Sequence, residues 1–131
     1  LFSKKVLPNW EAWLGLAFEG FCIQNAYYLA KKLGFADEID SFGPYFERGQ
    51  AGFQIDLIFK RMDKVITLCE IKYMKNPVGG LVIAEVEKKA RLLKIPKGYS
   101  LEKVLIAPNG AEKSVKESEY FHQILELKDL F

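Results

Sequence analysis

The sequence is poor in metal-binding and redox side chains. It contains one histidine, His122, and two cysteines, Cys22 and Cys69. Zinc centres need several Cys and His ligands at defined spacings, so this composition excludes one. Both cysteines lie within apolar runs, which indicates reduced core thiols rather than a disulfide. We therefore expect a protein of a reducing compartment, the cytoplasm.

Long apolar runs and an excess of one charge are also missing. No stretch reaches the ~18 apolar residues that cross a bilayer, so we expect no membrane partner. Nineteen Lys and Arg residues stand against seventeen Asp and Glu residues, a net charge of +2. This balance excludes general electrostatic binding of nucleic acid, so any affinity for phosphates must come from a local patch. The 131 residues, half of them hydrophobic, predict a single domain over 1–131.

Apolar spacing predicts a long N-terminal helix. Over residues 10–33 large apolar side chains recur every three or four positions: Trp10, Trp13, Leu14, Ala17, Phe18, Phe21, Tyr28 and Leu29. This pattern predicts one buried stripe, with Asn9 as the N-cap and Gly34 closing the end. Glu19 lies elsewhere on the helix, on a strip of small and apolar residues that we expect to approach a sheet closely: Gly15, Cys22, Ile23 and Ala26.

The middle of the chain predicts a β-hairpin. In residues 53–59 the odd positions are apolar, which places Phe53, Ile55, Leu57 and Phe59 on one face. Residues 65–73 are apolar on both faces, as in a central strand, and a short charged turn separates the two runs. Further patterns predict a weak strand at 44–47, a helix at 81–94 and strands at 102–107 and 124–127. We expect an α/β fold with a mixed central sheet flanked by helices.

Chemistry-bearing residues are concentrated in this hairpin. Glu70 and Lys72 are two apart and share a strand face that otherwise buries hydrophobic side chains, and the hairpin brings Asp56 near them. Buried charges need partners or a cation, because an uncompensated one costs several kcal/mol. Two carboxylates and the carbonyl of Ile71 form an oxygen-rich site suited to Mg²⁺ or Mn²⁺. With Lys72 to orient water, and Glu19 pointing toward the site, these parts suit phosphodiester hydrolysis.

These motifs resemble a known family. Asp56 followed by Glu70-Ile71-Lys72, after a helix bearing Glu19, is similar to the PD-(D/E)XK nucleases. Four stretches resemble more narrowly the C-terminal nuclease-like domain of bacterial and archaeal AAA-type P-loop ATPases: residues 13–19, 52–58, 69–73 and 127–131. Ile55 stands where the motif has proline. The chain contains no G-x-x-x-x-G-K-S/T motif, so any ATPase motor belongs to another part of a longer protein.

The resemblance implies a restriction-endonuclease-like αβββαβ core and a Mg²⁺- or Mn²⁺-dependent hydrolase. Asp56 and Glu70 would hold the metal, Lys72 would be the catalytic lysine and Glu19 the helix-borne acid. The implied partners are nucleic acid, DNA in particular, the ATPase domain of the same polypeptide, and a second copy in a homodimer.

Two other interpretations stay open. The domain could keep the fold without catalysis and bind nucleic acid or regulate the ATPase. Alternatively, Glu70 and Lys72 could form a structural ion pair, which predicts no metal binding. Lys88 and Lys89 are interpreted as exposed helix lysines and excluded from the catalytic set. Four basic residues are candidates for a phosphate-binding rim: Arg48, Lys60, Arg61 and Lys64.

Overall fold

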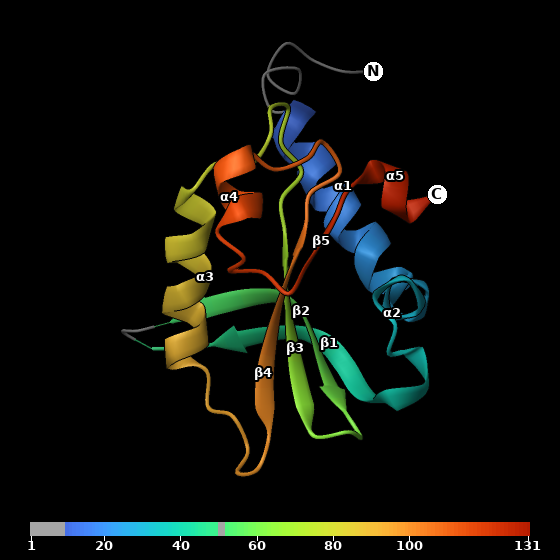
Figure 1. Ribbon diagram of the computed structural model, residues 1–131, viewed down its shortest axis with the longest axis vertical. Coiled ribbons are helices and arrows are strands. Elements are labelled where there is room, and N and C mark those ends of the chain that lie inside the picture. Colours follow the sequence, from blue (N-terminus) through green and yellow to red (C-terminus); the bar gives the residue numbers. More distant parts are fainter. Residues whose placement is uncertain (1–9, 50–51) are drawn as a thin grey trace.

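The computed structural model describes residues 10–49 and 52–131 (Figure 1). Within these ranges five strands form one open sheet: β1 (Ile39–Glu47), β2 (Phe53–Arg61), β3 (Val65–Ile71), β4 (Ser100–Ile106) and β5 (Gln123–Leu125). The helices are α1 (Trp10–Gln24), α2 (Ala26–Leu33), α3 (Leu81–Leu92), α4 (Lys113–Glu117) and α5 (Leu127–Leu130), with a 3₁₀ turn η2 at Ala36–Glu38. In this described part of the chain, no helix is long and apolar enough to span a membrane.

The sheet is mixed, and its spatial order follows the sequence order. Strands β1, β2 and β3 are antiparallel neighbours, whereas β4 runs parallel to β3 and β5 parallel to β4. The parallel pairs need crossover connections, which contain α3 and α4. The α/β class, the mixed sheet and the predicted hairpin are confirmed. The weak strand expected at 44–47 is the end of a nine-residue edge strand.

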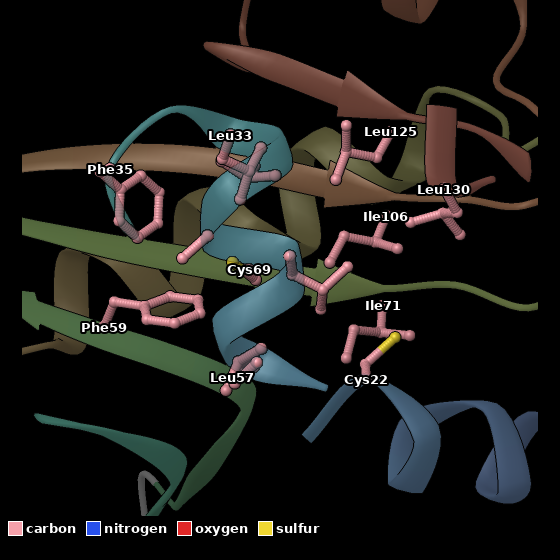
Figure 2. Close-up of a cluster of buried hydrophobic side chains, with 14 residues drawn as sticks. Cys22, Leu33, Phe35, Leu57, Phe59, Cys69, Ile71, Ile106, Leu125 and Leu130 are labelled. Atoms are coloured by element: carbon pink, nitrogen blue, oxygen red, sulfur yellow. The ribbon is translucent and has the colours of Figure 1, made fainter. Parts of the chain in front are cut away.

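Helices cover both faces of the sheet (Figure 1). On one face α1, α2 and α5 enclose a buried cluster that includes Leu29, Leu57 and Phe59 (Figure 2). On the other face α3 and α4 cover a second cluster, which includes Val86 and Leu68. Burial of this apolar surface is the main stabilising contribution to such a three-layer arrangement.

The N-terminal helix differs from the prediction because it is broken at Asn25, between α1 and α2. The Asn25 side-chain amide donates a hydrogen bond to the Phe21 carbonyl at 2.8 Å, a local bond through which Asn competes with regular helix. Gly34 ends α2 with φ +94°, in the left-handed conformation that glycine adopts without strain. The predicted cap Asn9 lies outside the described residues.

The predicted buried stripe of this helix is confirmed only for Leu29, which is fully buried, and in part for Phe18, which packs against the same cluster. Trp13 is 54% exposed, and Trp10, Phe21 and Tyr28 are exposed too. The residues that reach the sheet are smaller: Cys22, Ala26, Leu29, Ala30 and Leu33. Small side chains let the helix backbone approach the strands. Cys22 and Ala26 belong to the strip of small and apolar residues that was predicted beside Glu19.

Strand β2 does not keep one apolar face. Leu57 and Phe59 belong to the cluster under α2, whereas Ile55 belongs to the cluster under α3. The pairing with β1 explains the change: Ile58 lies opposite Gly43 and Ile55 opposite Tyr45, so two residues of β2, Asp56 and Leu57, oppose Pro44. Such a β-bulge inserts one residue and reverses the alternation of side chains. The single-face prediction for 53–59 is therefore wrong, and the bulge occurs at Asp56.

Candidate functional site

The candidate site lies where β2 and β3 separate. Their paired register runs from Lys60 opposite Ile66 to Leu57 opposite Cys69. If this pairing continued by one more residue, Asp56 would lie opposite Glu70. At that step the Ile71 N–H donates instead to Asp56 Oδ2, at 2.9 Å. The carboxylate of Asp56 thus replaces a backbone acceptor at the opening of the hairpin, and a second strand anchors the same segment because the Lys72 N–H donates to the Ile106 carbonyl.

A cavity of about 460 Å³ opens at this point and is lined by all five predicted site residues: Glu19, Asp56, Glu70, Ile71 and Lys72. They come from α1, β2, the end of β3 and the residue that follows it, Lys72. A larger hollow of about 540 Å³ lies beside Phe46 and Phe53, but its described lining contains only two charged side chains, Glu47 and Arg48. The smaller cavity is therefore the better candidate, because it gathers the titratable groups.

Glu70 is the buried centre of the site. It is 2% exposed, and both of its oxygens accept hydrogen bonds from Lys89 Nζ, Oε1 at 2.9 Å and Oε2 at 3.3 Å. Lys72 Nζ lies 3.8 Å from Oε2. Burial raises the pKa of Glu70, while the hydrogen bond and charge of Lys89 act in the opposite direction. Glu70 is therefore a desolvated carboxyl group whose charge depends on its cationic neighbours.

Lys72 is shared between two glutamates. Its Nζ donates to Glu85 Oε2 at 3.2 Å and also faces Glu70. Burial favours the neutral amine, but the hydrogen bond to Glu85 and the charge of Glu70 outweigh it and raise the pKa of Lys72. Lys72 is thus held as an ammonium at the cavity wall.

Glu19 adds a third carboxyl group. It extends from α1 into the cavity, where its carboxyl group interacts with that of Asp56. Burial is the largest cause of its raised pKa, followed by the charge and the hydrogen bond of Asp56, with a further contribution from Glu70. Three acidic groups therefore repel one another within one cavity.

The donor set fits a hard divalent cation. Mg²⁺ prefers carboxylate and carbonyl oxygens and is commonly held by one or two carboxylates with water completing the shell. Asp56, Glu70 and the Ile71 carbonyl are such donors, and a cation would relieve the repulsion that raises the pKa of Glu19. The two lysines already occupy Glu70, and no group of three His, Cys, Asp or Glu side chains in the described ranges forms a ready-made metal cage.

The structure adds two residues that the sequence interpretation left out. Lys89 was interpreted as an exposed helix lysine, but its side chain is 20% exposed and contacts Glu70. Glu85, which the sequence analysis does not single out, is exposed and contacts Lys72. A signal was available, because Lys89 follows the buried Val86 by three residues and Val82 by seven, which places it on the same helix stripe.

The proposed basic rim does not assemble around the cavity. Arg61 forms ion pairs with Asp63 at 2.6 Å and Glu102 at 2.7 Å. Lys60 lies 3.8 Å from Asp40, and its Nζ and that of Lys64 lie over the ring of Tyr99. Three of the four predicted rim residues therefore have local structural contacts at the opposite end of the hairpin.

Comparison of the chain with protein-family models, with curated proteins and with solved structures finds no match in any of the three.

Proposed function

We propose that this chain is a restriction-endonuclease-like domain that hydrolyses phosphodiester bonds in DNA with Mg²⁺ or Mn²⁺ as cofactor. The observation that supports the proposal is the convergence of Glu19, Asp56 and Glu70 with the ammonium of Lys72 in one cavity. The element order of a helix region, three antiparallel strands, a crossover helix and a parallel strand agrees with the αβββαβ core that the family resemblance implies.

Each residue has a proposed role that follows from its contacts. Asp56 and Glu70, with the Ile71 carbonyl, hold the divalent cation, and Glu19 supports it from α1. When bound, such a cation neutralises phosphate charge and lowers the pKa of a bound water. Lys72 donates hydrogen bonds from its ammonium, so it positions the attacking water and stabilises negative charge that develops on the phosphoryl oxygens.

The family resemblance also indicates the larger protein, the compartment and the oligomeric state in which the domain acts. The domain would be the C-terminal module of an AAA-type ATPase in the cytoplasm, acting on DNA as a homodimer. The pocket itself carries four acidic side chains and two lysines, so the cofactor must supply positive charge before a polyanion can enter.

A second candidate function is supported by one observation. Lys89 neutralises Glu70, and Lys72 is engaged by Glu85, so the buried charges are satisfied within the protein. This arrangement suits a non-catalytic domain that keeps the fold and binds nucleic acid or regulates an attached ATPase.

A metal titration coupled to a nuclease assay separates the two functions. Mn²⁺ is titrated calorimetrically into the wild type and Glu70→Gln, and the same samples are assayed on single- and double-stranded DNA. We expect binding in the wild type, loss of binding in Glu70→Gln and metal-dependent cleavage. Lys72→Met should abolish cleavage, while Lys75→Met, which removes an exposed lysine outside the cavity, should not. Metal binding without cleavage of either DNA would favour the second function, and absence of both would refute the proposed enzyme.

A further inference from the structure

Lys89 and the metal ion proposed above require the same atoms. Lys89 Nζ lies 2.9 Å from Glu70 Oε1 and 3.3 Å from Oε2, so one ammonium contacts both oxygens of this carboxylate. Mg²⁺ binds carboxylate oxygens at about 2.0–2.1 Å and demands near-octahedral geometry. A metal that binds Glu70 from the side of Lys89 needs the oxygen positions that the ammonium now contacts, so binding from that side requires movement of the lysine.

The two partners differ in their freedom to move. The carboxyl group of Glu70 is 2% exposed and enclosed by the sheet and α3, whereas the Lys89 side chain is 20% exposed and extends from α3 to the cavity. Lysine has a flexible four-carbon stem, so it can swing while Glu70 stays in place. The structure therefore contains one fixed ligand and one displaceable cation.

An acceptor for the displaced lysine lies one helical turn away. Glu85 precedes Lys89 by four residues on α3, the orientation in which a Glu–Lys pair stabilises a helix. Glu85 now binds Lys72, with Nζ at 3.2 Å. If Lys89 pairs with Glu85, that glutamate no longer requires Lys72, whose ammonium then remains beside the site.

We infer that Lys89 is a positioning residue that holds Glu70 in the metal-free protein and exchanges with the divalent cation, moving to Glu85 and releasing Lys72. This inference rests on the proposed metal-dependent function. It assigns α3 a role in loading the site: cation binding and release of Lys72 occur as one coupled exchange. In the metal-free protein, Lys89 thereby keeps the buried carboxylate of Glu70 paired.

The test is Mn²⁺ titration of the full chain at physiological salt, with Lys89→Gln, Lys89→Arg and the matched control Lys88→Gln. Lys88 is exposed and adjacent on α3, so its substitution removes the same charge from the same helix. Lys89→Gln should bind Mn²⁺ about tenfold or more tightly than the wild type, and Lys88→Gln within about twofold of it. Lys89→Arg, which keeps a cation, should remain close to the wild type.

Cleavage provides a second readout that a purely structural lysine would not alter. The Mn²⁺ concentration for half-maximal cleavage should fall in Lys89→Gln in proportion to the tighter binding. Should this variant be unfolded without metal, Mn²⁺ should restore its thermal unfolding transition; failure to do so would contradict the exchange.

The outcomes distinguish the exchange from the function on which it rests. Equal Mn²⁺ affinities for Lys89→Gln and Lys88→Gln, with clear binding by the wild type, overturn the exchange and leave the metal site standing. Binding by Lys89→Gln alone would show that Lys89 closes the site without exchanging, and it overturns the exchange. Absence of binding in every folded variant overturns both the exchange and the metal-dependent function.

Discussion

Replacement of Lys89 by methionine tests the electrostatics of the site without any metal or substrate. Methionine keeps much of the length of the lysine stem but has no ammonium. Glu70 would stay buried at 2% exposure, with Lys72 at 3.8 Å from Oε2 as its remaining basic contact. The substitution therefore removes one partner of a buried ion pair and leaves the other behind.

The expected cost follows from this geometry. Removing one member of a buried ion pair destabilises proteins by about 3–5 kcal/mol, because the remaining charge is desolvated and uncompensated. Since Lys72 still compensates part of the charge, we expect the lower end, about 3 kcal/mol near neutral pH. A domain with a typical stability of ~5–15 kcal/mol would remain folded.

The pH dependence identifies the cause. Burial already raises the pKa of Glu70 above its usual 4.5, and loss of Lys89 raises that pKa further. An acid with a raised pKa in the folded state binds more protons when folded, so stability falls as pH rises through the raised pKa. The cost of Lys89→Met should therefore be largest at neutral to alkaline pH and shrink as pH falls toward 4.5, where Glu70 becomes neutral.

Urea unfolding in chelator, followed by circular dichroism at about pH 5 and pH 8, measures this cost. Lys88→Met is the control, since its lysine is exposed and should change the free energy of unfolding by no more than about 0.5 kcal/mol. The reasoning is refuted if Lys89→Met is no more costly than Lys88→Met, or if its cost is the same at both pH values.

Two further predictions concern the helices over the other face. Leu29→Ala should lower the free energy of unfolding by about 2–5 kcal/mol in a denaturant titration, because Leu29 is fully buried. The control Leu16→Ala replaces a side chain that is 69% exposed and should cost no more than about 0.5 kcal/mol in the same titration. In chelator, the wild type should lose stability as pH rises above 4.5, because the pKa of Glu19 is raised by burial and by Asp56. Glu19→Gln should lose less stability over the same pH range. A variant whose stability falls as steeply as that of the wild type would contradict the placement of Glu19.

Most of the secondary structure could be predicted from local sequence patterns. The hairpin is confirmed because strand alternation and a short charged turn depend on neighbouring residues alone. The crossover helix α3 lies within the range predicted for it, 81–94, and the mixed sheet follows from an antiparallel hairpin succeeded by a helix and a strand. Trp10, Trp13 and Phe21 of α1 are exposed. Periodicity indicates an apolar stripe but not whether the rest of the chain covers it.

Four of the five predicted site residues line one cavity for a reason that is also local: Glu70, Ile71 and Lys72 are consecutive, and the hairpin brings Asp56 beside them. Their catalytic and metal-binding roles stay predictions. Lys89 is absent from the predicted catalytic set because its position on the buried stripe of α3 carries no information about a carboxylate on a neighbouring strand.

The sequence by itself determined the two hairpin strands, the crossover helix, the α/β class and the spacing of Asp56 from Glu70, because these depend mainly on local sequence patterns. Only the tertiary structure decided three features of the site: the bulge of β2 opposite Pro44, the approach of Glu19 to Asp56, and the pairing of Lys89 with Glu70. Each of these joins elements that are separate in sequence. Their contacts depend on strand register, on helix packing distance and on the cost of leaving a desolvated charge unpaired, which are properties of the assembled fold.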